Sequence, residues 1–329
     1  MTSDLSSGAK PKIAIRGGGI IGLSIAFELM TRGVTPTVLD RGDLKSKASW
    51  AAAGMLSARF EALIEPLFSE DLHALSARSI RLWPRFAARL QKQSDISLSF
   101  SEGPTLALLS EGSLSQLRAD RRLEGVDVED SAERLSALVP SLKSDDKRFV
   151  VFPDDGQVDN RAVLKALQQV CRPLFTDEES KVEDAEIIIE CLGWRANDVR
   201  PVKGQMVSLK PRERHPLIPV RWGASYIVPK PDRTIIGATV EPDETGLETD
   251  DEQIAAMLNA AINVCPALAD QMEILERWSG LRPMARDQRP MIGWTEVGRV
   301  FQATGHYRNG ILLAPATAER VADAVLAPI

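Results

Sequence analysis

An arginine near the end of the chain has the chemistry of an anion-binding group. Arg282 stands in the run Gly280-Leu281-Arg282-Pro283, where the glycine and the proline make a fixed bend that suits a side chain aimed into a pocket. A guanidinium binds a carboxylate through two parallel hydrogen bonds. A guanidinium in such a bend could hold a carboxylate, and a structural salt bridge is the competing interpretation.

The segment from Gly305 to Pro315 is typical of a glycine-hinged loop that runs into a helix N-terminus near Ile311. Such an N-terminus carries partial positive charge and stabilises negative charge that develops close to it. Pro315 is expected in the first helical turn, where a residue has no intrahelical N–H bond to lose. The loop is thus predicted to border a bound group.

A second glycine-rich segment lies near the start of the chain. Gly17, Gly19 and Gly22 follow an apolar strand and open a helix. In this arrangement the first glycine permits a tight turn, the second the approach of a pyrophosphate, and the third close packing of helix on strand. Asp40, eighteen positions after Gly22, is placed to accept a hydrogen bond from a ribose hydroxyl. A dinucleotide site is predicted, against the alternative of a mere glycine turn, and Arg16 must find a partner or reach solvent.

Small residues dominate the run from Ala48 to Met55, which reads Ala-Ser-Trp-Ala-Ala-Ala-Gly-Met. Their size allows a loop and a helix start to lie against a flat ring system, with backbone N–H groups and Ser49 serving phosphate or ring oxygens. The competing interpretation is a helix rich in alanine.

The elements that must position these residues follow from apolar periodicity and capping signals. Pro84 interrupts one helical pattern, and Thr249 with Glu252 forms a capping box before another. Helices are expected over Ile20 to Arg32, Leu72 to Gln91, Arg118 to Leu138, Asp159 to Cys171 and Ala318 to Leu326. Strands are expected over Lys12 to Arg16, Thr35 to Leu39, Thr105 to Leu109, Glu186 to Cys191, Ser225 to Val228, Thr234 to Ala238, Arg277 to Leu281 and Val300 to Ala303, with β character between Pro201 and Trp222.

The predicted fold class is α/β, and α+β for the chain as a whole. A Rossmann-like nucleotide-binding domain is expected to comprise residues 1–90, 150–200 and 291–329. A second domain built on an antiparallel sheet is expected to be interleaved with it, over residues 91–149 and 201–290.

Taken in order, the glycine turn, Asp40, the run from Ala48 to Met55, Ser279–Pro283 and Gly305–Pro315 resemble the FAD-dependent D-amino acid oxidase superfamily. Within it, the chain is most similar to glycine oxidases that supply thiamine-thiazole biosynthesis. The resemblance covers nearly the whole chain. One departure is the short segment from Arg172 to Ala185, where the family has a longer β-meander near the adenine, so the adenine contacts are not carried over.

The resemblance implies that Arg282 anchors the substrate carboxylate, that the Tyr226 hydroxyl shares it and that Arg308 contacts the substrate. A core tyrosine with an incidental hydrogen bond is the alternative for Tyr226. His306 is expected to contact the cofactor and not to act as a base. The implied cofactor-binding positions are Gly17, Gly19, Ile20, Ile21, Gly22, Asp40, Arg41, Ala48, Ser49, Ala53, Gly54, Met55, Gly193, His306, Tyr307, Arg308, Asn309, Gly310, Ile311 and Leu312.

The resemblance further implies oxidation of glycine, or of another small D- or N-methyl amino acid, to its imine by hydride transfer to non-covalent FAD. Dioxygen is then reduced to hydrogen peroxide. One alternative is a dehydrogenase that passes electrons to a quinone, and another is a flavin-binding protein without catalysis. The residues leave open which amino acid is preferred.

Composition excludes several other classes. A net charge of −6 without a block of like charge argues against nucleic acid or a membrane surface as partner. No apolar run is long enough to cross a bilayer, and Met1 to Lys12 lacks a signal core. Three widely spaced cysteines and three histidines fit neither a disulfide framework nor a metal centre. A cytoplasmic protein is expected, and homo-oligomerisation stays open.

Overall fold

The N-terminal glycine turn sits inside a parallel β-α-β unit. The computed structural model describes residues 10–64, 69–119, 127–129, 132–143 and 148–327. Strand β1 (Ile13–Arg16) leads through the glycines into helix α1 (Ile20–Thr31), and the chain returns in β2 (Thr37–Leu39). β1 and β2 pair in parallel. The predicted strand, turn, helix and strand are confirmed, with ends shifted by one or two residues.

Six strands, in the order β16-β17-β9-β1-β2-β8, form the first sheet. All neighbours pair in parallel except β16 and β17. Because β9 alone separates β1 from β17, the N-terminal glycine turn and the C-terminal loop emerge close together at one edge. The remaining strands of this sheet are β8 (Phe175–Thr176), β9 (Ile187–Glu190), β16 (Met291–Trp294) and β17 (Val300–Thr304).

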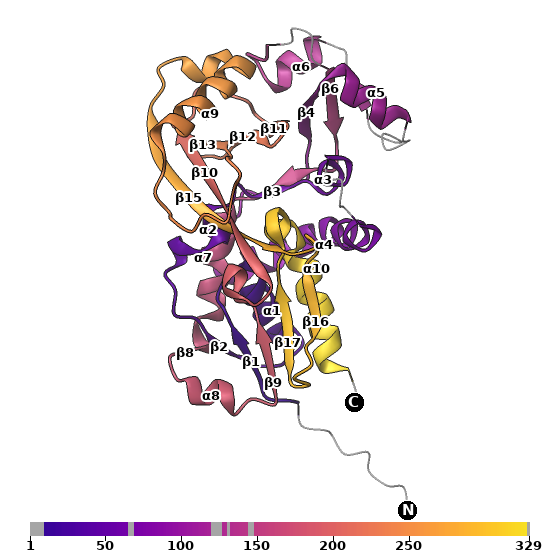
Figure 1. Cartoon of the computed structure of the whole chain (residues 1–329), viewed down its shortest axis with the longest axis vertical. Coiled ribbons are helices and arrows are strands. Elements are labelled where there is room, and N and C mark those ends of the chain that lie inside the picture. Colours follow the sequence, from indigo (N-terminus) through magenta and orange to yellow (C-terminus); the bar gives the residue numbers. More distant parts are fainter. Residues whose placement is uncertain (1–9, 65–68, 120–126, 130–131, 144–147, 328–329) are drawn as a thin grey trace, which may run out of the picture.

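Nine strands form the second sheet, in which β4 and β11 are the one parallel pair among the described residues. Figure 1 shows this sheet above the first, with the long strands β10 and β15 reaching down between the two. Its strands are β4 (Thr105–Leu109), β5 (Asp127–Glu129), β6 (Arg148–Phe152), β10 (Val199–Leu209), β11 (Val220–Trp222), β12 (Ser225–Pro229), β13 (Thr234–Gly237), β14 (Glu241–Pro242) and β15 (Ile274–Ala285).

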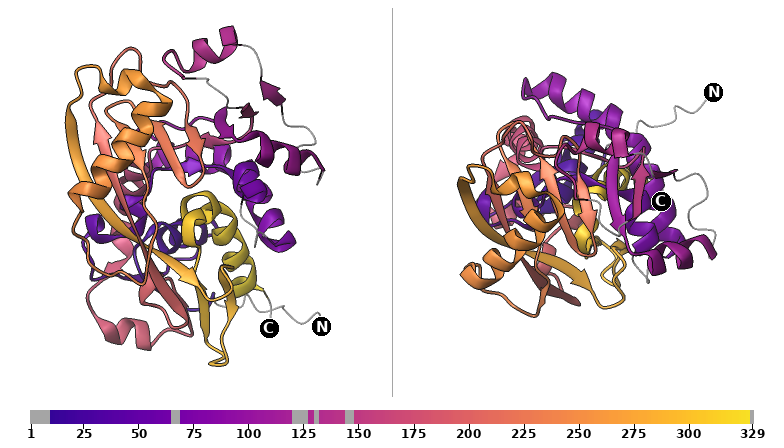
Figure 2. Two further views of the ribbon diagram at one scale, coloured as in Figure 1. Left: turned by 45° about the horizontal axis from the view of Figure 1, so that its top comes forward. Right: turned by 90° about the horizontal axis from the view of Figure 1, so that it is seen from above.

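Helices cover both sheets. Helix α1 packs against α7 and α10, and α10 packs against α4, so that the yellow C-terminal helix lies beside the violet α4 in Figures 1 and 2. These helices and the first sheet share the largest apolar core, while α9 closes a second core on the other sheet. The remaining elements are α2 (Ala48–Ala51), β3 (Met55–Leu56), α3 (Ala58–Ile64), α4 (Glu70–Ser94), α5 (Glu111–Ala119), α6 (Ala132–Leu138), β7 (Gly156–Gln157), α7 (Asn160–Cys171), α8 (Glu179–Glu183), α9 (Asp251–Val264) and α10 (Gly310–Leu326).

Two helix predictions are wrong. Pro84 does not interrupt α4, because the apolar face on either side of it, with Trp83 and Phe86, is buried in the core and holds the helix together. The continuous helix expected over Arg118 to Leu138 is wrong, since its described part contains β5 paired to β6. Residues 120–126 and 130–131 of this predicted helix lie outside the described residues. So do residues 1–9, which belong to the segment considered above for a signal core.

The cap of α9 is also different from the prediction. Asp250, and not Thr249, accepts a hydrogen bond from the backbone N–H of Gln253 at 2.9 Å, which moves the start of the helix by one residue. Asp159 caps α7 as predicted. No helix in the described part of the chain is long and apolar enough to span a bilayer.

The last helix begins at Gly310, which confirms the predicted N-terminus near Ile311 and extends the helix expected from Ala318 by eight residues. Pro315 is therefore its sixth residue and not a first-turn residue. Pro315 has no N–H for the helical ladder. Two side chains of α4 bind the backbone beside the proline, since Ser79 Oγ and Trp83 Nε1 both donate to the carbonyl of Leu312, at 2.6 and 2.9 Å. The backbone N–H of Ala316 in turn donates to Ser79 Oγ at 3.3 Å.

Replacing Ser79 with alanine is expected to lower the free energy of unfolding by about 1–3 kcal/mol, because a buried backbone N–H then loses its acceptor. Chemical denaturation measures the change. Ser113→Ala, at an exposed serine of α5, is the matched control and should change stability by less than about 0.5 kcal/mol. Equal stability of the Ser79 variant and the control would show that the Ala316 N–H needs no side-chain partner.

Candidate active site

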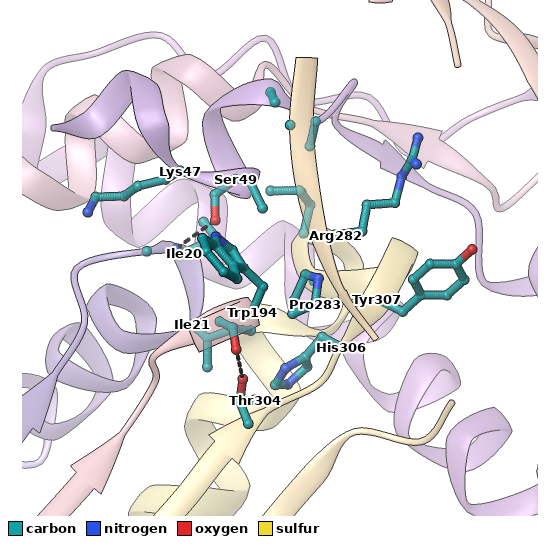
Figure 3. Close-up of a pocket in the computed structure, with 18 of the residues that line it drawn as sticks. Ile20, Ile21, Lys47, Ser49, Trp194, Arg282, Pro283, Thr304, His306 and Tyr307 are labelled. Atoms are coloured by element: carbon teal, nitrogen blue, oxygen red, sulfur yellow. Dashed lines mark hydrogen bonds between the residues drawn. The ribbon is translucent and has the colours of Figure 1, made fainter. Parts of the chain in front are cut away.

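One cavity of about 670 Å³ runs between the two sheets, a size suited to a cofactor or a substrate. The glycine turn before α1, the run from Ala48 to Met55, the turn after β9 and the loop before α10 form its walls. The faces of β10, β11, β12 and β15, with Glu61 of α3, form the remaining wall. Segments from both ends of the chain therefore meet around a single space, and Figure 3 shows them converging there.

The glycine turn presents the start of α1 to this cavity. Gly17 has a φ of 109°, and a side chain there would overlap the carbonyl of Cys191. The backbone N–H of Ile20, in the first turn of α1, donates to Ser49 Oγ at 3.1 Å. Gly19, Ile20 and Ile21 line the cavity. Backbone N–H groups at the start of a helix are suited to a pyrophosphate, so this wall fits a dinucleotide.

Charged side chains gather at the end of β2. Asp40, the predicted ribose acceptor, forms an ion pair with Lys47 at 2.7 Å, and both are largely buried. Arg16 and Arg41 each bond to Glu179, both at 2.7 Å. Arg16 has therefore found the partner that its position requires. Glu179 belongs to α8, so the shortened segment from Arg172 to Ala185 still supplies a polar residue to this end of the cavity.

The small-residue run is held rigidly against the cavity. Only Ala48–Ala51 is helical, so the alternative of a long alanine-rich helix is wrong. Asn160 Nδ2 donates to the carbonyls of Ser49 and Trp50 at 2.8 and 3.1 Å. Gly280 of β15 lies so close to Ala51 that any side chain on it would collide with the alanine. The resulting flat wall of small residues suits a planar ring system.

The C-terminal loop forms the facing wall. Thr304 Oγ1 donates to the carbonyl of Gly193 at 3.0 Å, the lower contact drawn in Figure 3. The ring of His306 bonds to Thr317 Oγ1 at 3.1 Å, and burial lowers the pKa of His306 to about 3. The ring is therefore neutral. Residues Tyr307 to Ile311 line the cavity and place the N-terminus of α10 against it.

Arg282 lies in a notch between two backbone segments. Its Nη1 donates to the carbonyls of Lys203 and Thr239, each at 3.2 Å. A side chain at Gly204 would overlap the guanidinium, so the notch exists because that residue is glycine. Its recorded partners are carbonyls, not carboxylates, which disfavours a structural salt bridge. Burial lowers the pKa of Arg282, and the nearby Arg308 guanidinium lowers it further, so an anion bound here would be stabilised.

Tyr226 stands beside Arg282 on the cavity wall. Its cross-strand neighbour Gly237 has no side chain, which leaves room for the phenol. Burial raises the pKa of Tyr226, while the guanidinium groups of Arg282, Arg221 and Arg308 act in the opposite direction. The phenol therefore keeps its proton at neutral pH and can donate a hydrogen bond.

Twenty of the predicted site residues line the one cavity. The exceptions are Gly22, which packs α1 against the Gly17 carbonyl, and Leu312, whose carbonyl is taken by Ser79 and Trp83. Lining residues without a sequence-based prediction include Lys47, Glu61, Glu179, Trp194 and Arg221. Trp194, directly after Gly193, and Lys47, directly before the Ala48–Met55 run, adjoin predicted segments that could have drawn attention to them.

Comparison with known proteins agrees with this geometry. A family model described as FAD dependent oxidoreductase matches residues 12–324. A glycine oxidase of Bacillus licheniformis is 31% identical, covering 94% of this chain and 91% of its own. The crystal structure of a glycine oxidase from Geobacillus kaustophilus superimposes with a TM-score of 0.86 at 29% identity, covering 97% of this chain and 95% of that one.

A bifunctional ThiO/ThiG protein of Trichormus variabilis is 33% identical over 95% of this chain. The chain spans about half the length of that relative, 52%. The predicted family, its fold and its FAD cofactor are confirmed by these similarities, and the predicted enzyme class, an FAD-dependent amino acid oxidase, agrees with them.

Proposed function

Because the chain belongs to the family of FAD dependent oxidoreductases, we propose that it is an oxidase of glycine or another small D- or N-methyl amino acid. The products are the imine and hydrogen peroxide. The carrying observation is the buried Arg282 guanidinium beside the Tyr226 phenol on the cavity wall. Together they offer donors of the kind that bind a carboxylate.

The walls of the cavity fit FAD. The first turn of α1 would hold the pyrophosphate, Asp40 and its neighbours the ribose, and the small-residue run from Ala48 to Met55 one side of the ring. The N-terminus of α10 would stabilise negative charge on the ring. When bound, FAD accepts the two electrons and the hydrogen that leave the substrate and passes the electrons to dioxygen.

The residues of the chain supply position and electrostatics. Arg282 and Tyr226 hold the carboxylate, and Arg308 lies near enough to Arg282 to add to the positive field. The fixed loop and the closely packed α2 hold the ring wall in place, so the substrate is oriented without further reorganisation. His306, kept neutral and bonded to Thr317, supports the loop and takes no proton.

The reaction is tested with the purified holoenzyme and a panel of glycine, sarcosine, D-alanine and D-proline. Under anaerobic conditions at least one of them should bleach the flavin absorbance near 450 nm, and with oxygen the same amine should give peroxide. Bleaching without peroxide would favour the alternative dehydrogenase that uses a quinone. Absence of bleaching by every amine would favour a non-catalytic flavin protein.

Location and pathway are part of the same proposal. The three cysteines are free and buried, as is usual in a reducing compartment, which supports a cytoplasmic location. The ThiO names among the relatives support a role in thiamine biosynthesis, in which the imine is consumed for thiazole synthesis.

A further inference from the structure

A buried ion pair in the cavity wall has no role in the proposed reaction as described so far. Arg221 of β11 and Glu61 of α3 join through Nη2 and Oε1 at 2.8 Å, and both residues line the cavity. In the pairing of β11 with β12, Arg221 stands directly opposite Tyr226. Directly opposed residues share one face of a sheet. The ion pair therefore lies next to Tyr226, at the substrate end of the cavity.

Within this pair, the Arg221 side chain is buried slightly more deeply than that of Glu61. The Arg221 side chain is 3% exposed and that of Glu61 is 8% exposed. The guanidinium carbon lies 3.6 Å from the centre of the Phe60 ring. Nε and Nη1 of Arg221 have no partner among the described residues. Arg221 thus directs its ion pair to Glu61, and a buried pair of this kind is weak evidence for a contribution to stability.

The proposed reaction creates a need for a proton acceptor. An amino acid arrives mainly as its ammonium form, but the nitrogen lone pair must be free before the C=N bond can form. The N–H proton must therefore leave first, while its electron pair stays on nitrogen. A carboxylate close to the amino group can take that proton.

Four other titratable groups of the described cavity wall are unsuited to this task. Asp40 is paired with Lys47, and Glu179 with Arg16 and Arg41, at the nucleotide end. His306 bonds to Thr317, and its pKa of about 3 makes it a poor base. Tyr226 keeps its proton because burial raises its pKa. Among the lining carboxylates, Glu61 is left as the one at the substrate end.

We propose that Glu61 binds the amino group of the substrate and accepts its proton, and that Arg221 is the positioning residue that holds the Glu61 carboxylate at the cavity wall. In the step, one N–H bond breaks, an O–H bond forms on Glu61, and no electrons leave the substrate. The inference rests on the proposed amino acid oxidase. It adds a residue that recognises the amino group of the substrate, while Arg282 binds the carboxylate.

Glu61 binding of the amine is tested without turnover. The probes are 2-aminoisobutyrate, which has an amine and a carboxylate but no hydrogen on Cα, and isobutyrate, which lacks the amine. Dissociation constants come from the change in flavin absorbance of the holoenzyme. The wild-type protein should bind 2-aminoisobutyrate at least about tenfold more tightly than isobutyrate, since an ammonium–carboxylate hydrogen bond is formed only by the first.

Glu61→Gln should remove that preference and leave isobutyrate binding within about threefold of wild type. Glu273→Gln, at a surface ion pair with Lys210 and Arg212, is the matched control and should keep the preference. A wild-type protein without preference, or a Glu61 variant that keeps it, would overturn the inference. Because no turnover is involved, failure of the oxidase assay alone would contradict the proposed function and not amine binding.

Proton acceptance is tested by the pH dependence of kcat/KM. At pH 7, where the substrate amine is mostly protonated, Glu61→Gln should lower kcat/KM by about 10²-fold. The loss should shrink toward about pH 10, where the free amine is abundant. Besides Arg221 and Tyr226, the charged or titratable groups around Glu61 include Asp155, packed at the start of α3. Burial raises the pKa of Asp155 to about 6, so the comparison is made from pH 7 upward.

A purely structural role for Glu61 would give the same fold-loss at every pH, and that result would contradict proton acceptance. Arg221 is tested in parallel. Arg221→Met should also weaken the preference for 2-aminoisobutyrate, and Arg221→Lys, which keeps the charge, should restore part of it. Full preference in Arg221→Met would remove Arg221 from the proposal.

Discussion

Replacing Arg282 with alanine will raise KM for the amino acid far more than it changes any other property of the protein. The guanidinium is buried and donates to two backbone carbonyls, so its removal takes away the charge that would hold the carboxylate. Loss of one member of a buried charge pair costs about 2–5 kcal/mol. Since about 1.4 kcal/mol corresponds to a factor of ten, kcat/KM should fall roughly 30- to several-thousand-fold. Steady-state peroxide assays measure it.

The control lies on the same strand. Arg277 of β15 pairs with Asp251 at the surface, so Arg277→Ala changes an arginine of the same element without touching the cavity. Its kcat/KM should stay within about threefold of wild type. An Arg282→Ala protein with wild-type KM and turnover would remove Arg282 from the substrate site.

A methyl group at Gly22 is expected to abolish FAD retention. The added carbon would overlap the backbone carbonyl oxygen of Gly17, which cannot rotate away as a side chain could. Helix α1 would have to move off β1, at a cost of about 1–3 kcal/mol, and the turn that receives the pyrophosphate would be distorted. Purified Gly22→Ala should carry at least about tenfold less FAD than wild type, as read from the ratio of visible to ultraviolet absorbance.

Gly298→Ala is the companion to this variant. A carbon added at Gly298 meets no other atom within 4 Å, and the backbone there does not require glycine. It should bind FAD as the wild type does. Full FAD occupancy in Gly22→Ala would show that the close approach of α1 to the glycine turn is unimportant for the cofactor.

Local patterns were sufficient for the nucleotide half of the fold. The strand, glycine turn, helix and acid of the first β-α-β unit are encoded by consecutive residues, and the structure contains them. The same holds for Asp159, which caps α7 through two backbone N–H groups that follow it directly. The resemblance of the separate motifs then predicted that distant segments share one cavity, which they do.

Features that depend on tertiary contacts escaped prediction. Beside Pro315 in the interior of α10, Ser79 and Trp83, more than 200 positions earlier in the chain, bond to the backbone of Leu312 and Ala316. Glu61 became a candidate only when β11 placed Arg221 next to it. No sequence spacing records either contact, because both join elements that meet only in the folded chain.

The most direct test of the account is a crystal structure of the holoenzyme with 2-aminoisobutyrate bound. We expect the pyrophosphate of FAD at the first turn of α1, its ring between the Ala48–Met55 run and the loop before α10, and the ligand carboxylate on Arg282 and Tyr226. A ring bound elsewhere, or a carboxylate held away from Arg282, would contradict the account.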